Sequence, residues 1–326
     1  MKSKHIVIDC RMFGQEFTGI GVYNLMLVQN LIQIDQINRY TLLINQPHDF
    51  FRSLPSNFQT LTVNCQIYSF KEQIKLTPVL YKLKADLVHF TNFNQPLLYF
   101  KKQVTTIHDL TLFFYKGKKH KNLFSRIMFY LVFLKSAIFS SKIICVSKHT
   151  KKDLDQKFKI TKNKSHAIYL GFKQVHNKAK RLDALNKEKF ILYTGNWREH
   201  KNLPNLIRAF QILKNKYKIP HKLVLTGKPN RLYPETQNLI KKLKLTQDVH
   251  LTGLVPNANL VWLFKHASVY VQPSFYEGFG LPILEALSHN TPVCSSNTSC
   301  MPEIAQDCAN YFNPHKPQDI AKSILE

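Results

Sequence analysis

Acidic residues are scarce in this 326-residue sequence, and the chain is strongly basic as a result. It holds 20 Asp and Glu against 46 Lys and Arg, a formal net charge of +26. Residues 1–180 carry 28 basic and 9 acidic side chains, and between Asp109 and Asp153 ten Lys and Arg occur without one acid. A field of this sign attracts nucleic acid or an anionic membrane surface. The alternative is that the excess is solvated charge spread over the whole surface.

Other absences exclude several classes of protein. The first nine residues form a short basic lead into a strand and lack the apolar stretch, about 7–15 residues long, of a signal peptide. The longest apolar run, 127–139, is interrupted by Lys135 and is too short to span a bilayer. Six cysteines occur without a Cys-x-x-Cys pair and without a zinc-ligand spacing to histidine. We therefore expect a cytoplasmic protein in a reducing compartment.

Glycine and proline are also few, at 10 and 15 residues, and they form no flexible linker or low-complexity tract. No internal repeat is apparent. With 44% apolar residues the chain can bury large cores, and its length is about twice that of one compact domain. These features predict two folded domains.

Short apolar runs alternate with helical patterns in two series. The first series predicts strands at 5–9, 40–45, 87–91, 104–108 and 142–147, and helices at 23–34, 122–140 and 148–158. The second predicts strands at 190–194, 222–226, 249–252 and 268–272, and helices at 204–217, 234–243, 258–266 and 282–289. Continuous apolar strands between helices indicate parallel sheets covered on both faces. We predict an α/β fold of two doubly wound domains facing a cleft, residues 1–175 and 185–326, divided within the basic stretch 173–189.

The segment 272–287 carries the most specific pattern. It follows a predicted strand and places Glu277 in a loop and Glu285 about one turn into a helix, with Gly278 and Gly280 between them. Glycines let backbone N–H groups approach a ligand beside the positive end of a helix. Carboxylates at this spacing can accept hydrogen bonds from sugar hydroxyls. The alternative is a capping acid and a surface acid beside an ordinary turn.

The run from Tyr276 to Glu285 resembles the donor-site signature of family 4 glycosyltransferases. Between these two residues it reads Glu-Gly-Phe-Gly-Leu-Pro-Ile-Leu. The resemblance continues through 291–293, 297–299 and 302–304 to 311–314, and covers nearly the whole chain. It implies two Rossmann-like domains of GT-B type and transfer of a sugar with retention. No metal ion is expected, because Lys201 can neutralise the charge that a divalent ion would neutralise. The resemblance also implies that Glu285 holds the ribose of a nucleotide sugar and that the donor sugar lies against Glu277, Gly278, Phe279, Gly280 and Leu281.

A second motif, 194–203, follows the first strand of the second predicted domain and precedes a helix. Positioned cations stabilise the charge that develops on a departing nucleoside diphosphate. The segment resembles the family's Gly…Lys-Asn motif, which implies that Gly195 and Lys201 lie at the diphosphate and that Lys201 neutralises its charge. Arg198 is a second candidate, because Asn196 stands where some relatives carry a basic residue. The alternative for both cations is a basic helix lead exposed to water.

Two motifs belong to the first predicted domain. Gly19 and Gly21 lie after the opening strand, before a predicted helix, where the family has a glycine loop near the diphosphate and the acceptor. His108 and Asp109 end a predicted strand and match a motif whose His approaches the donor sugar, with Asp109 supporting the loop. Each is open to a purely structural interpretation, since a short Gly-x-Gly and a single His are weak signals alone. Ser147 is interpreted as the cap of the next helix.

Residues 116–135 combine basic and aromatic side chains without an acid. Such segments can lie on an anionic membrane surface, and many relatives act on lipid-linked acceptors there. We expect peripheral contact with the inner face of the cell membrane through this segment. The alternative is a core helix after a solvated lead.

The resemblance implies a hexosyltransferase of cell-surface polysaccharide synthesis with a glycan or lipid-linked acceptor. Its substrate is a GDP- or UDP-linked sugar, and no cofactor or metal is expected. Residues 18–23 resemble the loop of the group's mannosyltransferases, which implies a mannose donor. Members usually continue beyond the point that corresponds to Glu326 into helices that cross back to the first domain, so a catalytically impaired partner protein is an alternative. A basic nucleic-acid-binding protein is a second alternative, but no motif for it is present.

Overall fold

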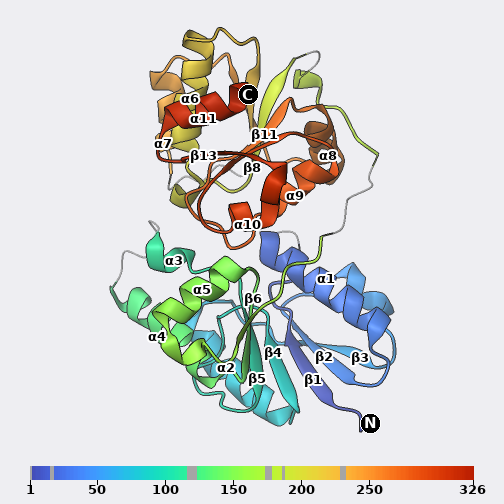
Figure 1. The fold of residues 1–326 in the computed structure, drawn as a ribbon. Helices are drawn as coiled ribbons and strands as arrows, with labels where there is room; N and C mark the ends of the chain where they lie inside the picture. The colour runs from blue at the N-terminus through green and yellow to red at the C-terminus, as the bar shows by residue number, and fades with distance from the viewer. Residues whose placement is uncertain (1, 15–17, 116–122, 173–177, 186–187, 228–232) are drawn as a thin grey trace. The chain divides into compact units, whose positions relative to one another are not determined.

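The computed structural model describes residues 2–14, 18–115, 123–172, 178–185, 188–227 and 233–326. The chain divides into two compact units (Figure 1). Unit 1 comprises Met1–Leu110 and His120–Gly171, and unit 2 comprises Thr111–Lys119 and Phe172–Glu326. Parts of the predicted boundary, 173–177 and 186–187, lie outside the described residues.

Unit 1 is built on a sheet of seven parallel strands in the order β3-β2-β1-β4-β5-β6-β7. The strands are β1 (His5–Asp9), β2 (Arg39–Ile44), β3 (Phe58–Thr62), β4 (Leu87–Phe90), β5 (Gln103–Ile107), β6 (Lys142–Cys145) and β7 (Ser165–Ala167). All ladders are parallel, so the loops that follow the strands gather at one edge, the carboxyl edge of the sheet.

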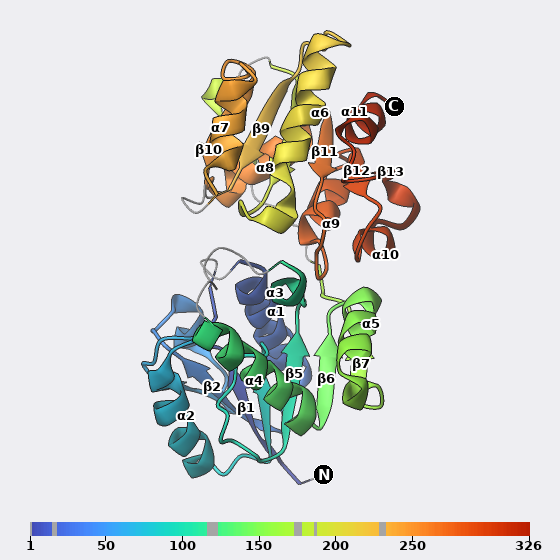
Figure 2. The same ribbon diagram turned by 90° about the vertical axis from the view of Figure 1, so that its left-hand side faces the viewer.

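Helices cover both faces of this sheet (Figures 1 and 2). One core cluster joins α1 (Thr18–Ile34) and the 3-10 helix η2 (Asp49–Ser53) to one face. A second joins α2 (Phe70–Lys82) to the other, where α4 (Leu123–Phe139) also lies. The unit is completed by α5 (Lys148–Lys157) and the 3-10 helix η3 (Lys159–Thr161).

Unit 2 has a sheet of six parallel strands in the order β10-β9-β8-β11-β12-β13. The strands are β8 (Phe190–Thr194), β9 (Lys222–Thr226), β10 (Val249–Gly253), β11 (Val269–Gln272), β12 (Val293–Ser296) and β13 (Asn310–Phe312). Counted along the chain, this is the 3-2-1-4-5-6 order of Rossmann folds, in which the strand order reverses between the first and fourth strands. Ligands bind outside the carboxyl ends of the strands at that point, here between β8 and β11.

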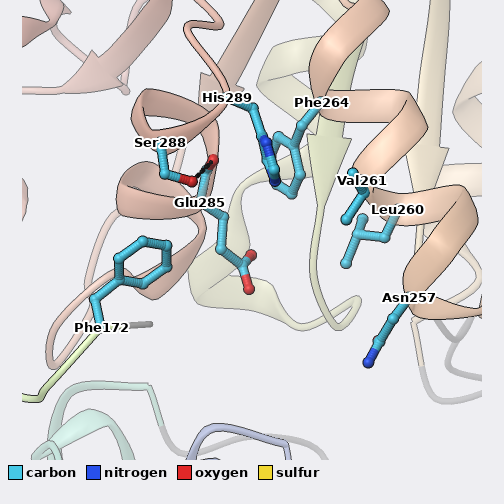
Figure 3. Close-up of a pocket in the computed structure, with 8 residues that line it drawn as sticks. All are labelled: Phe172, Asn257, Leu260, Val261, Phe264, Glu285, Ser288 and His289. Carbon is cyan, nitrogen blue, oxygen red and sulfur yellow. Dashed lines mark hydrogen bonds between the residues drawn. The ribbon is translucent and has the colours of Figure 1, made fainter. Parts of the chain in front are cut away.

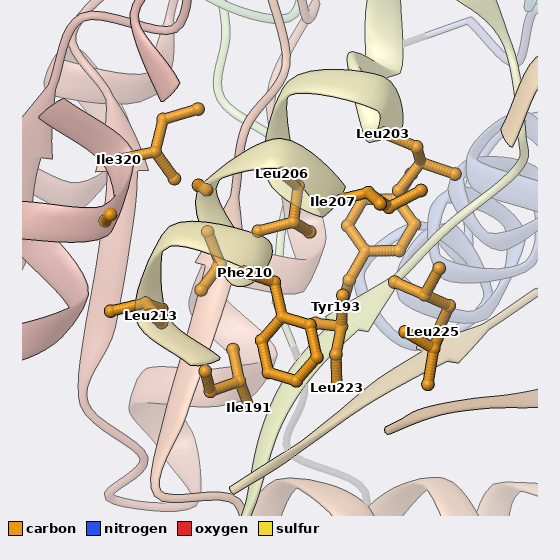
Figure 4. Packing of buried hydrophobic residues seen from close by; sticks show 14 of the residues in the cluster. Ile191, Tyr193, Leu203, Leu206, Ile207, Phe210, Leu213, Leu223, Leu225 and Ile320 are labelled. Atoms are coloured by element: carbon orange, nitrogen blue, oxygen red, sulfur yellow. The ribbon is translucent and has the colours of Figure 1, made fainter. Parts of the chain in front are cut away.

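Two clusters of buried side chains hold the helices of unit 2 to its sheet. The first packs α6 (Leu203–Asn215), α7 (Glu235–Lys242) and α11 (Pro317–Leu325) on one face. In Figure 4 the apolar stripe of α6, with Leu206, Phe210 and Leu213, faces side chains of β8 and β9. The second packs α8 (Asn257–His266), α9 (Leu281–Ser288) and α10 (Met301–Ala305) on the other face. The remaining short helices are α3 (Thr111–Phe114), η4 (Asp183–Leu185), η5 (Glu199–Lys201) and η6 (Gln306–Cys308).

The prediction of two doubly wound parallel-sheet domains is confirmed. The predicted bounds of β1, β8 and β9 are those of the structure. One helix start was wrong: α1 begins at Thr18 and not near residue 23, so Gly19 and Gly21 lie in its first turn and not in a loop before it. In the part of the chain that is described, no helix is both long and apolar enough to cross a membrane.

Candidate functional site

The strongest constellation lies at the carboxyl ends of β8 and β11, which are neighbours in the sheet of unit 2. After β8 the chain makes an extended turn at Gly195 and enters η5, which ends at Lys201. After β11 it enters the loop that contains Glu277. A backbone hydrogen bond of 2.8 Å from the Phe275 amide to the His200 carbonyl ties the two loops together. The two motifs recognised in the sequence are therefore parts of one site.

Lys201 and Glu277 form a close ion pair at the centre of this site. The ammonium Nζ lies 2.6 Å from Oε1 and 2.7 Å from Oε2 of the carboxylate. Both side chains are largely buried, with 20% of Lys201 and 11% of Glu277 exposed. The sequence assigned the two residues to different parts of the donor, and it contained no signal that they pair directly with each other.

Neighbouring side chains hold the same carboxylate in place. Oε1 of Glu277 accepts hydrogen bonds from Gln272 Nε2 at 2.7 Å and from Ser274 Oγ at 2.6 Å. The Ser299 hydroxyl donates to the Glu277 carbonyl at 2.7 Å. Gln272 and Ser274 were part of the sequence motif but had no predicted role. Their side chains are fully enclosed, so only the tertiary structure shows that they converge on Glu277.

Opposing effects set the pKa of Glu277. Burial acts to raise this pKa, but the charge of Lys201 and a smaller effect of His200 outweigh it, and the net pKa lies below the usual value. Hydrogen bonds from Lys201 and Ser274 act in the same direction. Glu277 is therefore ionised near neutral pH, as a carboxylate paired with a cation should be.

Glu285 lies in a different environment on α9. This helix starts after Gly280, which adopts a left-handed φ of 91° that side chains disfavour. Figure 3 shows the Glu285 side chain in a hollow between α9 and α8, opposite Leu260 and Val261. Among the described residues its carboxylate has no hydrogen-bond or ion-pair partner, and burial raises its pKa to about 7. A half-buried carboxylate without a partner is suited to hydroxyl donors of a ligand.

Three glycines end adjacent strands at this edge of unit 2. Gly195 and Gly227 directly follow the threonines that end β8 and β9, Gly253 is the last residue of β10, and each of the three has a positive φ. A Cβ on Gly227 would lie 2.0 Å from the Gly195 carbonyl oxygen. The backbones at Gly195 and Gly227 thus approach each other too closely for a side chain on Gly227.

The structure distinguishes the two cations proposed for the diphosphate. The guanidinium of Arg198 is exposed and makes no hydrogen bond or ion pair with any residue that the structure describes, although its backbone carbonyl accepts a hydrogen bond from the Lys201 amide at 3.0 Å. Asn202 directly follows Lys201 and has a left-handed backbone conformation. Its side-chain amide donates hydrogen bonds to the carbonyls of Pro273 and Pro314 at 2.9 and 2.8 Å, which anchors the chain next to Lys201. Asn202 was a positioning residue that the sequence motif contained but did not explain.

Gly278 and Phe279 are buried beside Glu277, and Leu281 is the first residue of α9. Aromatic contacts support this loop from outside: the Tyr115 ring stacks at 6.2 Å on Phe275, and Phe114 lies 5.1 Å from Tyr276. The signature loop is therefore a buried segment that aromatic rings pack against.

In unit 1, His108 lies at the carboxyl end of β5. Its Nε2 is 2.8 Å from the Thr91 carbonyl, which can only accept, so Nε2 carries the proton and Nδ1 keeps its lone pair. Burial lowers the pKa of His108, opposed in part by this hydrogen bond and by the charge of Asp109. The Tyr23 ring packs edge-on at 5.0 Å. His108 is thus a neutral, oriented imidazole, and Asp109 is half-buried directly after it.

The two glycines of α1 differ in their surroundings. A Cβ on Gly21 would lie 1.8 Å from the Gly14 carbonyl oxygen, whereas a Cβ on Gly19 would meet nothing within 4 Å. Gly21 is required by the close packing of the loop after β1, and Gly19 is not. Ser147 caps α5 by accepting a hydrogen bond from the Thr150 amide at 3.0 Å, as interpreted from the sequence.

Across the described parts of the chain, no group of three or more His, Cys, Asp or Glu side chains is placed to hold a metal ion.

Two family models together match residues 19–326. Residues 19–173 match the model described as Glycosyltransferase Family 4, and residues 174–326 match the model described as Glycosyl transferases group 1. The chain belongs to the family 4, group 1 glycosyltransferases. The first model covers most of unit 1 and the second most of unit 2, including Lys201, Glu277 and Glu285.

Similar curated proteins span nearly all of the chain. It is 27% identical over 333 residues to O-antigen chain mannosyltransferase B of Escherichia coli, covering 95% of this chain and 86% of that protein. It is 23% identical to O-antigen chain mannosyltransferase RfbU of Salmonella typhimurium, covering 95% and 87%.

Solved glycosyltransferase structures share the fold. HepE of Anabaena in complex with UDP and glucose superposes with a TM-score of 0.72 at 16% identity, covering 98% of this chain and 89% of that one. WaaG, a glycosyltransferase of lipopolysaccharide biosynthesis, gives a TM-score of 0.71 at 14% identity, covering 99% and 90%. These likenesses establish the GT-B fold of this glycosyltransferase.

Proposed function

We propose that this glycosyltransferase moves a hexose, with mannose as the favoured sugar, from a nucleoside diphosphate to a hydroxyl of a glycan or lipid-linked acceptor. We further propose that it does so with retention and without a metal ion. The observation that carries the proposal is the convergence of Lys201, Glu277 and Glu285 on the carboxyl edge of one Rossmann sheet, at its strand-order reversal.

Lys201 supplies the charge chemistry at this edge. A diphosphate that leaves with both electrons of the glycosidic bond gains negative charge, and a positioned ammonium stabilises it. In the structure the ammonium is held by Glu277, so the diphosphate competes with that carboxylate for Lys201. Glu277 then remains fixed by Gln272 and Ser274 and can accept hydrogen bonds from sugar hydroxyls.

Glu285 is assigned to the ribose. Its partnerless carboxylate in the hollow beside α8 supports this role, since two vicinal ribose hydroxyls offer two donors to one carboxylate. His108 is assigned to the donor sugar, because its neutral ring has one nitrogen fixed on Thr91 and the other free to accept. Gly19, Gly21, Asp109, Gly195, Arg198 and the 278–281 loop remain proposed donor contacts.

Mannose and a surface polysaccharide are supported by the relatives. Two proteins that match 95% of this chain are O-antigen chain mannosyltransferases by name. The UDP bound in the HepE structure supports a nucleoside diphosphate as the leaving group. The titration below distinguishes guanine from uracil as the base.

Peripheral membrane contact is part of the proposal. Residues 116–122 of the predicted segment lie outside the described residues, but α4 follows them. Leu123 and Phe124 on α4 are 68% and 66% exposed, and Arg126 beside them is exposed too. Apolar and basic side chains on one helix favour an anionic bilayer surface.

Calorimetric titration with UDP, GDP and ADP tests the donor assignment. We expect micromolar binding of one diphosphate to the intact chain, with at least about a tenfold loss in Lys201→Ala and Glu285→Ala. Lys242→Ala, at an exposed lysine of α7, is the matched control and should bind like the parent. Failure of all three diphosphates to bind folded protein would reject the transferase proposal. Binding without sugar transfer would instead indicate a catalytically impaired homologue.

A further inference from the structure

Tyr68 in unit 1 has an unusual backbone conformation. It lies between β3 and α2 with a left-handed φ of 62°, and its side chain is 60% exposed. A bulky residue with a Cβ is strained in this region, which glycine occupies freely. Because most of the Tyr68 side chain is exposed, burial of its ring does not offset the energetic cost of this backbone conformation. Such strain persists only where the surroundings enforce it, and it is concentrated at functional sites.

Buried ionic contacts enforce this conformation. The Tyr68 amide donates a hydrogen bond of 2.8 Å to Oε2 of Glu72, which is completely buried. The Arg11 guanidinium lies 2.6 Å from Oε1 of Glu72, and the Asn94 side-chain amide donates to both oxygens at 2.8 and 3.0 Å. Arg11 in turn forms a two-pronged pair with Asp9 at 2.8 and 2.7 Å. This network joins β1, α2 and the loop after β4 to the backbone of Tyr68.

The Tyr68 side chain is also positioned. Its hydroxyl accepts a hydrogen bond of 3.1 Å from the Asn92 amide, and its ring lies 6.0 Å from Phe93. Asn92 directly follows Thr91, whose carbonyl fixes Nε2 of His108. The ring therefore lies at the carboxyl edge of the sheet, at the end of β4. The strand order of this sheet reverses between β1 and β4. One backbone step separates the anchor of Tyr68 from the anchor of His108.

We propose that Tyr68 is a platform for a sugar ring of the acceptor, with the amide of Asn92 fixing its orientation. A pyranose has an apolar face of C–H groups and a rim of hydroxyls. The face of an aromatic ring carries negative charge density that attracts C–H groups, and tyrosine offers this surface with few rotatable bonds. The assignment rests on the proposed function, because it places acceptor binding beside the histidine assigned to the donor sugar.

The test measures glycoside binding and donor binding separately on the full chain. Methyl α-D-mannopyranoside is the probe, followed by saturation-transfer difference NMR. We expect transfer to its ring C–H protons with the parent protein and at least about tenfold weaker binding in Tyr68→Ala, since the apolar contact face is removed. Tyr68→Phe keeps the ring and should stay within about threefold of the parent, because it removes the hydroxyl and its hydrogen bond with Asn92 but leaves the apolar contact face. Phe70→Ala removes an aromatic ring that is 73% exposed two residues away and should change nothing.

A Tyr68→Gly variant separates binding from folding. Glycine adopts the left-handed conformation freely, so this variant should be at least as stable as Tyr68→Ala and still fail to bind the glycoside. If Tyr68→Ala binds the probe like the parent, or the folded parent does not bind it, the platform is rejected. Nucleoside diphosphate titration of the same samples reports on the proposed donor site at Lys201, Glu277 and Glu285. Loss of the platform with intact diphosphate binding would overturn this inference but not the proposed transferase. Glycoside binding at Tyr68 without diphosphate binding would overturn the transferase, and with it the acceptor role of Tyr68.

Discussion

The ammonium of Lys201 lies within 2.7 Å of both carboxylate oxygens of Glu277, although 76 positions separate the two residues in the chain. The cation proposed for the diphosphate is therefore paired with a buried anion. Such a pair keeps two largely buried charges compensated by each other.

Breaking this ion pair from one side should destabilise unit 2. Lys201→Met leaves Glu277 as a buried charge without its cation, and we expect a loss of about 3 kcal/mol in the free energy of unfolding. Glu277→Gln should cost less, because Lys201 is 20% exposed and gains access to water more readily. The measurement is urea unfolding followed by Trp197 and Trp262 fluorescence, as both tryptophans lie in unit 2.

The double variant Lys201→Met/Glu277→Gln supplies the control. With both charges removed, no buried charge is left unpaired, and stability should return close to that of the parent. Diphosphate binding should remain lost. If the double variant is as unstable as the sum of the single variants, the two residues do not act as a pair in solution.

Diphosphate affinity should rise with pH around neutrality because of Glu285. Burial raises the pKa of this carboxyl to about 7, and the ionised form accepts through both oxygens, whereas the protonated form turns one oxygen into a hydroxyl donor and is the weaker acceptor of two ribose hydroxyls. Between pH 6 and pH 8 we expect up to about a tenfold gain in affinity, measured by calorimetry. Glu285→Gln cannot ionise, so only the titration of the nucleotide itself should remain in its profile. Identical profiles in the two proteins would exclude Glu285 from the effect.

The same carboxyl affects stability in the opposite direction. Its pKa in the folded protein is above the usual 4.5, so the folded state binds more protons than the unfolded state between pH 4.5 and about 7. Its contribution to stability is fully present below pH 4.5 and is lost as the pH rises through about 7. Glu285→Gln should remove this slope.

The buried Lys135 should make the stability of unit 1 depend on pH above neutrality. This lysine of α4 is buried, its ammonium donates to Gln95 at 2.9 Å and to Gln103 at 3.2 Å, and burial lowers its pKa to about 7. The unfolded state then binds more protons between about pH 7 and 10.5, so stability rises with pH across this window. Lys135→Met should remove this dependence of stability on pH. Circular dichroism together with hydrogen exchange of the β5 amides measures it. Lys142→Met, at an exposed lysine at the start of β6, should keep the slope.

Gly21 and Gly19 form a matched pair for the packing of α1. Gly21→Ala places a Cβ 1.8 Å from the Gly14 carbonyl and should cost at least about 3 kcal/mol. Gly19→Ala meets nothing and should leave stability unchanged or raise it by up to about 1 kcal/mol, since alanine is the better helix residue. Thermal unfolding by circular dichroism compares them. Equal effects of the two substitutions would show that the close approach of the loop is not present in solution.

The elements missed in the sequence share a physical cause. β3 is an edge strand with only Phe58 buried, so it lacks the apolar run by which central strands are recognised. β7 and β13 are three residues long, and half of β12 is serine. α2 carries Pro78 in its interior, a residue that counts against a helix in the sequence. Such elements are stabilised by pairing with neighbouring strands and by packing against other elements. The local pattern of apolar residues in the sequence does not reveal these contacts.

The sequence by itself determined the fold class, the family motifs and the residue types of the proposed donor site. Long apolar strands and amphipathic helices have local periods, and the signature around Glu277 and Glu285 is contiguous. Only the tertiary structure decided that Lys201 pairs with Glu277, that Gln272 and Ser274 fix the same carboxylate, and that Asn92 holds the ring of Tyr68. These contacts join residues on different strand ends, and parallel β-α units bring them together at one edge of a sheet irrespective of their separation in the chain.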